Sequence, residues 1–171
     1  DCIAHIGRQT CISHDSFEVI VVDNGSTDDT ASVARSALAN LQCDTKCVVE
    51  VKEGKVNAFL HGLRLSEAPL VTVVDDDNMI AEDFAFHSMQ FFADFEQLGV
   101  VGSYNTVDGD DVPAWFAVAA SRYGCAAPHV SGDIRSVDEY RGIASYGLIA
   151  GAGSTFRKEP LLRALDLGFG F

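Results

Sequence analysis

The stretch FEVIVVDNGSTDDT, residues 17–30, decides the fold class of this chain. It opens with a short apolar, β-branched run that ends at Asp-Asn-Gly, a pattern that predicts a buried strand followed by a tight turn. Ser26 and Thr27 then offer helix-capping hydroxyls, and Asp28 and Asp29 are acids that we expect in the first turn of a helix. A strand, a turn and a helix in this order predict an α/β unit.

The rest of the chain alternates in the same way. Further strands are expected over residues 47–51, 70–74, 98–104 and 147–156, and further helices over residues 55–65, 82–95 and, in part, 115–123, with a last helix that has Pro160 in its first turn. The strands are almost continuously apolar, which indicates a sheet covered by helices on both faces. The expected apolar helix faces carry Ala34, Ala37, Leu38 and Leu41, then Val56, Phe59, Leu60 and Leu63, then Phe84, Phe91, Phe92 and Phe95.

Composition excludes several classes of protein. The chain has 171 residues, one domain's worth, and we expect a single domain over residues 1–171. Its net charge of -13 argues against a nucleic-acid partner, which needs clustered Lys and Arg. No apolar run is long enough to span a membrane. The five cysteines lack paired metal-ligand spacing, so we expect free thiols in a cytoplasmic protein, or one peripheral to the inner membrane.

Acidic residues follow two of the expected strands: Asp23 after VIVV, and Asp75, Asp76 and Asp77 (the acid cluster) after VTVV. Ligands of such sheets bind at the carboxyl ends of the strands. If the backbone stays extended, Asp75 and Asp77 share one face, and two convergent carboxylates favour a bound cation. Oxygen ligands in small number suit Mg²⁺ or Mn²⁺, which take further ligands from substrate phosphates.

Other interpretations of the acid cluster stay open. A solvated acidic turn that caps the next helix explains the pattern equally well when the cluster is taken alone. A phospho-aspartate hydrolase would also place Asp at a strand end beside magnesium. An EF-hand calcium loop is disfavoured, because Met79 and Ile80 stand where further ligands would be needed.

Taken together, these stretches resemble the family 2 glycosyltransferases, which have the GT-A fold. The resemblance is carried by FEVIVVDNGSTDDT, by GKVNAFLHGL at residues 54–63, by VTVVDDDN at residues 71–78 and by IAGAGSTFRKEPL at residues 149–161. It runs from about residue 9 to the end and is loose over residues 107–143. It implies a GT-A-like, Rossmann-like three-layer α/β domain with a mostly parallel, mixed central sheet.

The resemblance also implies roles for individual residues. Asp23, with Asn24 beside it, would contact the nucleobase, and Lys55 would lie near the base or the phosphates. Asp75 would approach the ribose or the metal, and Asp77 would hold the Mg²⁺ or Mn²⁺ that bridges the diphosphate. Asp76 would lie on the nucleotide side and be the least needed of the three acids. The segment Gly151, Ala152 and Gly153 would let the backbone approach the sugar or the acceptor. The role of His61 is left open.

Two parts of the family pattern are not found in the sequence. The opening DCIAHIGRQT looks like the helix after the family's first strand, and no acidic Glu-Asp pair that could supply the general base lies between Gly151 and Phe171. We therefore expect a fragment without the first strand, with its catalytic base beyond Phe171.

The resemblance predicts a metal-dependent, inverting glycosyltransferase. It would transfer a sugar from a nucleotide-diphospho-sugar, most simply a UDP-sugar, to a saccharide or lipid-linked acceptor hydroxyl. The alternatives are a catalytically silent nucleotide-sugar binding fragment and a nucleotidyltransferase.

Overall fold

The computed structural model describes residues 1–102 and 153–168. The strand predicted at residues 17–22 is β1 (Glu18–Asp23), and it pairs in parallel with β2 (Asp44–Val49). β2 begins and ends earlier than the predicted 47–51, so that Val49, and not Val51, lies opposite Asp23. Its early start brings Asp44 and Thr45 into register with Glu18 and Val19, which means that the pairing extends β2 into a polar stretch that periodicity alone did not mark as a strand.

A second sheet has the strand order β3–β5–β4. It consists of β3 (Leu70–Val73), β5 (Ser154–Arg157) and β4 (Val100–Val101), and β5 is antiparallel to both neighbours. The described strands are therefore both parallel and antiparallel, which confirms a mixed arrangement. They form two sheets, and the predicted excess of parallel pairings is not seen among them.

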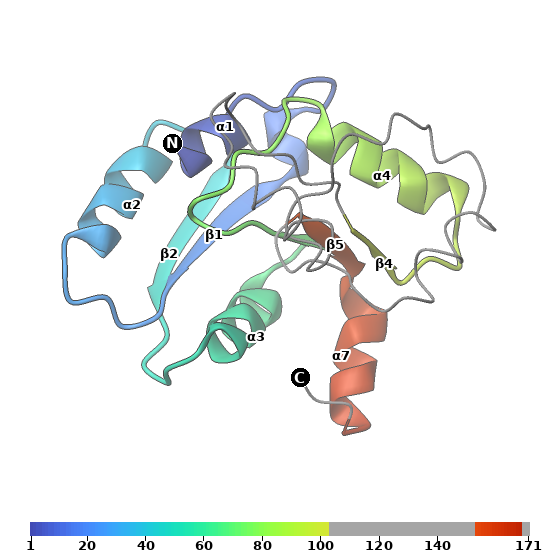
Figure 1. Ribbon diagram of the computed structural model, residues 1–171. Helices are drawn as coiled ribbons and strands as arrows, with labels where there is room; N and C mark the ends of the chain where they lie inside the picture. The colour runs from blue at the N-terminus through green and yellow to red at the C-terminus, as the bar shows by residue number, and fades with distance from the viewer. Residues whose placement is uncertain (103–152, 169–171) are drawn as a thin grey trace, which may run out of the picture.

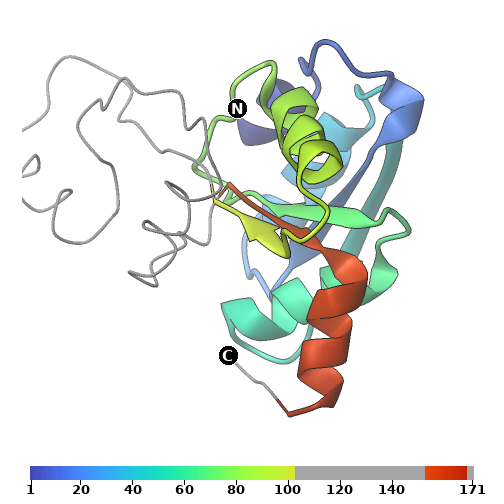
Figure 2. The ribbon, with the colours of Figure 1, turned by 90° about the vertical axis from the view of Figure 1, so that its right-hand side faces the viewer.

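The helices are α1 (Cys2–Ile6), α2 (Thr30–Leu38), α3 (Lys55–Leu65), α4 (Phe84–Asp94) and α7 (Lys158–Asp166), with a short 3-10 helix η1 (His14–Ser16). In Figure 1, α2 and α3 lie on opposite sides of the β1–β2 pair. Figure 2 shows α4 on one side of the three-stranded sheet and α3 and α7 on the other. The predicted three-layer α/β architecture is thus present, and Pro160 lies in the first turn of α7 as expected.

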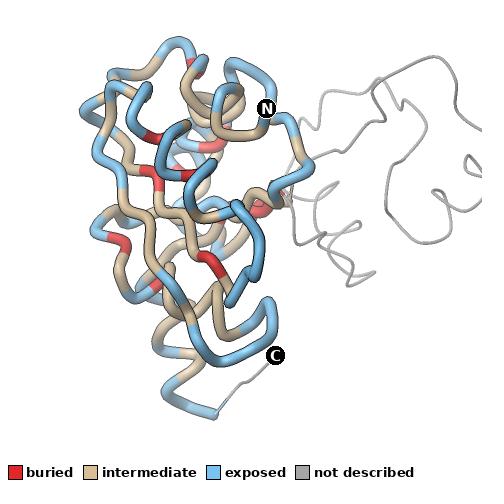
Figure 3. Tube along the Cα trace, turned by 90° about the vertical axis from the view of Figure 1, so that its left-hand side faces the viewer, coloured by how far each residue is buried: buried red, intermediate tan, exposed pale blue. Residues whose placement is uncertain are grey.

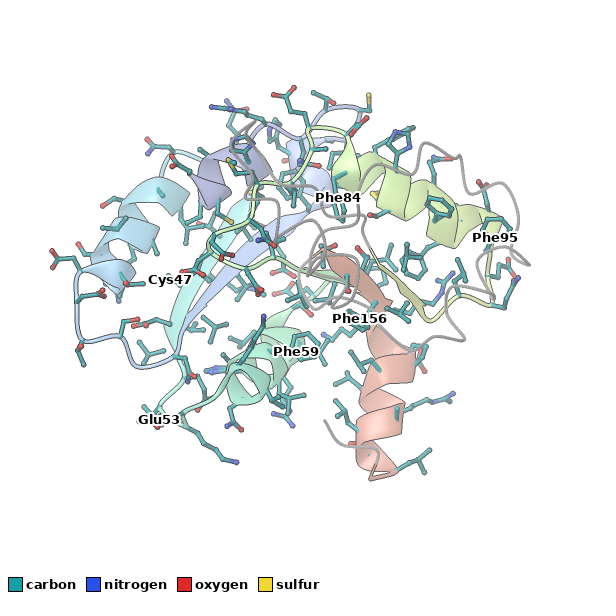
Figure 4. All side chains as sticks on the ribbon, viewed as in Figure 1. Cys47, Glu53, Phe59, Phe84, Phe95 and Phe156 are labelled. Carbon is teal, nitrogen blue, oxygen red and sulfur yellow. The ribbon has the colours of Figure 1, made fainter. Side chains whose placement is uncertain are left out.

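Buried residues come from nearly every layer, and Figure 3 marks them as short red stretches along the Cα trace. The buried apolar residues of the described chain are Val19, Ala34, Leu38, Leu63, Phe92 and Val101. Figure 4 shows Phe59 of α3 beside Phe156 of β5, with ring centroids 5.9 Å apart, so aromatic packing joins α3 to the second sheet. Arg157 of β5 also joins the second sheet to α4, because its guanidinium lies over the Phe92 ring.

Two expectations about the helices are wrong, one about a buried face and one about where a helix begins. Val56 was predicted on the buried side of α3 but is 42% exposed, whereas Leu63 is 1% exposed. The close approach is near the carboxyl end of α3, where a Cβ added to Gly62 would lie 3.2 Å from Val22 Cγ2. The acids Asp28 and Asp29 precede α2 and do not enter its first turn, because the helix begins only at Thr30.

Some predictions fall outside the described residues. These are the helical patch at residues 115–123, most of the strand at 147–156 and the end of the strand at 98–104. In the described ranges Cys2, Cys11, Cys43 and Cys47 are free thiols, as expected. No helix in those ranges is both long and apolar enough to cross a membrane.

Candidate functional site

Asp23 closes β1 and is buried at the carboxyl end of the strand. Its Oδ1 accepts a hydrogen bond from the Ser26 N–H at 2.9 Å. Hydrogen bonds from the Ser26 hydroxyl and the Ser26 N–H lower the pKa of the Asp23 carboxyl. A carboxylate with spare acceptor capacity can bind the N–H groups of a base or the hydroxyls of a ribose. Asp23 thus has the position and the charge that the sequence predicts for it.

Asn24 joins the end of β1 to the segment between β2 and α3. Its Nδ2 donates to the carbonyls of Glu50 and Lys52, at 2.9 and 2.8 Å, and its Oδ1 accepts from the Gly54 N–H at 2.7 Å. Both ends of the amide are therefore engaged with the backbone. The contact of Asn24 with a nucleotide stays a prediction. In the structure, Asn24 holds the segment that leads into α3.

Lys55, the first residue of α3, reaches the acid cluster. Its Nζ lies 2.7 Å from each oxygen of the Asp75 carboxylate. Because Asn24 holds Gly54 and Lys55 follows directly, a continuous path runs from the end of β1 to the loop after β3. The structure thus places Lys55 against Asp75, and Asn24, the neighbour of Asp23, holds the residue before Lys55.

The backbone of the acid cluster differs from the prediction. β3 ends at Val73, and the Asn78 N–H donates to the Asp75 carbonyl at 3.0 Å, which closes a turn over Asp76 and Asp77. The argument that alternate residues of an extended strand share a face is therefore wrong for Asp75 and Asp77. Asp76 and Asp77 are exposed, and Asp77 Oδ1 accepts from Asn78 Nδ2 at 3.0 Å. This geometry also fits the acidic turn that the sequence left open as an alternative.

A divalent metal fits this cluster only with help from a ligand. In the described part of the chain, no group of three or more His, Cys, Asp or Glu side chains is arranged to hold a metal ion. Asp75 already binds one cationic group, the Lys55 ammonium, so its carboxylate is accessible to a cation. Mg²⁺ and Mn²⁺ are commonly held by one or two carboxylates together with substrate phosphates. Asp75 and Asp77 are carboxylates of the type in that donor set, and the metal role of the pair stays a prediction.

Gly153 is the described residue of the predicted sugar and acceptor segment; Gly151 and Ala152 lie outside the described residues. Gly153 has φ +73°, a conformation that favours glycine, and its N–H donates to the Val73 carbonyl at 2.7 Å. Ser154 is paired with Val73 in the sheet. The start of β5 therefore lies directly beside the end of β3, from which the acid cluster emerges.

Glu50, at the end of β2, was missed by the sequence analysis. Its N–H donates to the Asp23 carbonyl at 2.8 Å, and its Oε1 accepts from the Lys52 N–H at 2.7 Å. His61 Nδ1 lies 3.1 Å from Glu50 Oε2 but is not aligned for a hydrogen bond. Glu50 was missed because the strand was expected over residues 47–51, which put this acid inside the strand and not at its end.

Cys2 is a second unexpected neighbour of the acid cluster. Its Sγ donates to the Asp75 carbonyl at 3.4 Å. Burial raises the pKa of the Cys2 thiol; the N-terminal ammonium opposes that effect, and the carboxylates of Asp75, Asp76 and Asp77 add to it. The thiol is therefore kept protonated beside the acids, where it acts as a weak donor.

These features define an α/β protein with acidic side chains at the carboxyl ends of β1 and β3. The family described as Glycosyl transferase family 2 matches residues 1–153, and the chain belongs to this family. The acidic strand ends and the helix that begins at Lys55 all lie within the matched range.

Curated relatives are glycosyltransferases and polysaccharide-synthesis proteins. Glycosyltransferase GlyG of Streptococcus pneumoniae serotype 4 is 25% identical over 123 residues, which are 72% of this chain and 40% of GlyG. Succinoglycan biosynthesis protein ExoU of Rhizobium meliloti is 36% identical over 86 residues, 50% of this chain and 24% of ExoU. Poly-beta-1,6-N-acetyl-D-glucosamine synthase of Staphylococcus epidermidis is 33% identical over 85 residues, 49% of this chain and 20% of that protein. The chain thus spans less than half the length of each.

Among solved structures, the chain resembles S. aureus TarS. The crystal structure of TarS 1–349 in complex with UDP matches with a TM-score of 0.64 and 22% identity, over 96% of this chain and 44% of that one. The complex of the same TarS segment with UDP-GlcNAc matches with a TM-score of 0.59 and covers 96% of this chain. At this identity the likeness shows the fold, and it confirms the predicted GT-A-like α/β class.

Proposed function

We propose that this chain forms the donor-binding part of a glycosyltransferase that takes a sugar from a nucleoside-diphospho-sugar, most simply a UDP-sugar. Membership of the family supports the reaction class, and the TarS complexes with UDP and UDP-GlcNAc support the donor class. The observation that carries the proposal is the path from Asp23 and Asn24 through Gly54 to Lys55 and Asp75. It holds an acceptor for a base or ribose and a cation for phosphate in one connected site.

Each end of this path would bind a different part of the donor. The Asp23 carboxylate, ionised at neutral pH, would accept hydrogen bonds from the nucleobase or the ribose. The Lys55 ammonium is 64% exposed at its side chain, and it can turn from Asp75 toward a phosphate without the loss of a buried contact. Asp76, exposed in the turn, would stay on the nucleotide side and contribute least.

Asp75 and Asp77 would hold a Mg²⁺ or Mn²⁺ ion together with oxygens of the diphosphate. When bound, such an ion supplies Lewis-acid stabilisation of the negative charge on the departing diphosphate. The Lys55 ammonium would stabilise the same negative charge on the diphosphate. Because the acid cluster keeps a net negative charge after pairing with Lys55, it still favours a divalent cation.

The transfer itself would join an acceptor hydroxyl oxygen to the anomeric carbon while the bond from that carbon to the diphosphate oxygen breaks. For an inverting reaction, a base takes the hydroxyl proton. We propose that Gly151, Ala152 and Gly153 border the sugar, and that residues 1–171 act as one domain. The names of ExoU and of poly-beta-1,6-N-acetyl-D-glucosamine synthase favour a saccharide acceptor, with a lipid-linked one as the alternative.

Calorimetry with two ligands tests the proposal. UDP and uridine are titrated into the chain with and without Mn²⁺. We expect Mn²⁺ to strengthen UDP binding at least tenfold and to leave uridine binding unchanged, because only UDP carries the diphosphate that shares the ion. UDP binding that is identical with and without Mn²⁺ would refute the metal role of the acid cluster. A chain that binds neither ligand would refute the nucleotide site as a whole.

A further inference from the structure

Gln9, a residue that the site described above does not use, is 5% exposed and makes two hydrogen bonds to another part of the chain. Its Nε2 donates to the Ala81 carbonyl at 2.7 Å, and its Oε1 accepts from the Ala85 N–H at 2.8 Å. The adjacent Thr10 donates its backbone N–H to the Glu82 carbonyl at 2.6 Å. Both ends of the buried Gln9 amide are thus satisfied, as burial of a polar side chain requires.

These contacts fall at the far end of the loop that carries the acid cluster. The loop occupies residues 74–83, between the end of β3 and the start of α4. Its first end is held by the sheet, but its second end meets a helix whose first N–H groups have no partner within the helix. Asp83, the N-cap residue of α4, makes no side-chain capping bond. Gln9 supplies the missing partner from a different segment by accepting from Ala85.

The same N-terminal segment also contacts the beginning of the loop. Cys2 of α1 donates to the Asp75 carbonyl. Figure 1 shows the loop from β3 passing beside α1 on its way to α4. Residues 2–10 therefore bracket the loop at Asp75 on one side and at Ala81, Glu82 and Ala85 on the other.

We propose that Gln9 is a positioning residue, which fixes the loop so that Asp75 and Asp77 present their carboxylates to a metal–diphosphate ligand. This inference rests on the proposed function. Gln9 binds the backbone on both sides of the junction between loop and helix, at the Ala81 carbonyl and at the Ala85 N–H, so it fixes the direction in which the loop enters α4. Partners that orient metal ligands typically contribute 10–100-fold to metal affinity, so the effect of losing Gln9 is measurable.

The test compares Gln9→Met, which keeps the size but removes both hydrogen bonds, with Gln90→Met, which changes an exposed glutamine on α4. UDP affinity is measured with and without Mn²⁺ on the whole chain, well below the unfolding midpoint of every variant. For Gln9→Met we expect the gain from Mn²⁺ to fall about tenfold, with UDP affinity in the absence of metal unchanged. Gln90→Met should behave as the wild type.

A second measurement separates positioning from folding. Hydrogen exchange at Asn78, whose N–H closes the turn over the acid cluster, should become faster in Gln9→Met than in Gln90→Met.

The outcomes distinguish two failures. If the wild type shows no gain from Mn²⁺, the proposed metal role of the acid cluster is wrong, and exchange at Asn78 still decides whether Gln9 orders the loop. If the wild type gains affinity and Gln9→Met gains equally, or if exchange at Asn78 is unchanged, the positioning role is refuted, even where Gln9→Met is less stable.

Discussion

Lys55 and Asp75 form an ion pair in which the Lys55 Nζ lies 2.7 Å from each carboxylate oxygen. The pair joins the first residue of α3 to the loop after β3. The Lys55 ammonium lies against the first of the three acids, and it reduces the repulsion between their carboxylates in a chain of net charge -13. One cation beside three carboxylates leaves an excess of negative charge, which is what a divalent ion requires.

The Lys55→Ala variant should bind UDP about tenfold more weakly without Mn²⁺, since a charge-assisted contact to the phosphates is lost. Lys52→Ala, which removes an exposed lysine of the preceding segment, is the matched control and should change little. Stability should fall by less than about 1 kcal/mol, because the pair is solvent-exposed. Calorimetry and urea unfolding measure both quantities. Equal losses of affinity in the two variants would contradict a specific role for Lys55.

Asp76 and Asp77 provide an internal comparison within one turn. Asp77→Asn should abolish most of the gain in UDP affinity from Mn²⁺, whereas Asp76→Asn should keep it within about threefold, because we assign the metal contact to Asp77 alone of these two. Both substitutions remove one charge from adjacent exposed positions, so general electrostatics affects them alike. A similar loss in both would mean that the turn attracts the ion by its net charge only.

Asp23→Asn should weaken UDP and uridine binding alike, with or without Mn²⁺, since the residue is assigned to the base or ribose. Asp29→Asn, at an N-cap position without a side-chain capping bond, is the control. The pKa of Asp23 is lowered below its usual 3.8, so its carboxylate stays charged from pH 5 to 8 and should cause no change in affinity there. Retention of uridine binding in Asp23→Asn would place the base elsewhere.

Glu18 should make stability depend on pH at the acidic end. Burial raises the pKa of Glu18, but the Glu67 N–H and the Lys46 ammonium outweigh it, so the folded pKa lies below 4.5. The stabilisation is therefore present above pH 4.5 and is lost as the pH falls through the folded pKa. In Glu18→Gln, the loss of unfolding free energy between pH 7 and about pH 3.5 should be smaller than in the wild type.

Glu53→Gln, an exposed glutamate at the end of the segment before α3, is the control for Glu18→Gln and should reproduce the wild-type pH profile. At alkaline pH, Lys46 makes stability depend on pH in the opposite direction, so that stability falls as the pH rises. Hydrogen bonds from Lys46 to Glu18 and Glu67 raise the pKa of Lys46, so its contribution is complete below pH 10.5 and is lost above it. An identical acid limb in Glu18→Gln and Glu53→Gln would rule out Glu18 as its source.

Leu63→Ala should destabilise the chain by about 2–5 kcal/mol, because Leu63 is 1% exposed and its removal leaves a cavity between α3 and the sheet. Leu167→Ala, at a residue that is 78% exposed, should cost less than about 0.5 kcal/mol. Urea unfolding followed by circular dichroism measures the difference. Equal costs would mean that α3 does not pack against β1 in solution.

Several elements could be predicted from local sequence alone. The helix α3 has the predicted bounds of residues 55–65, because Gly54 precedes it and Ser66 leaves the helical conformation on the way to Pro69. β1 agrees with its apolar run to within one residue at each end. Asp23 lies at the predicted strand end for the same reason. β2 was misplaced, since its first residues are polar and become a strand only by pairing with β1.

The sequence by itself determined the α/β class, the order of the acidic strand ends and the residue types at the site, because apolar periodicity and turn residues act over a few neighbours. The tertiary structure alone decided which of these residues meet. It paired Lys55 with Asp75 and placed Gln9 against the start of α4. Such contacts join residues 20 to 76 positions apart, and no local pattern encodes them, because they arise only when packed layers bring separate segments together.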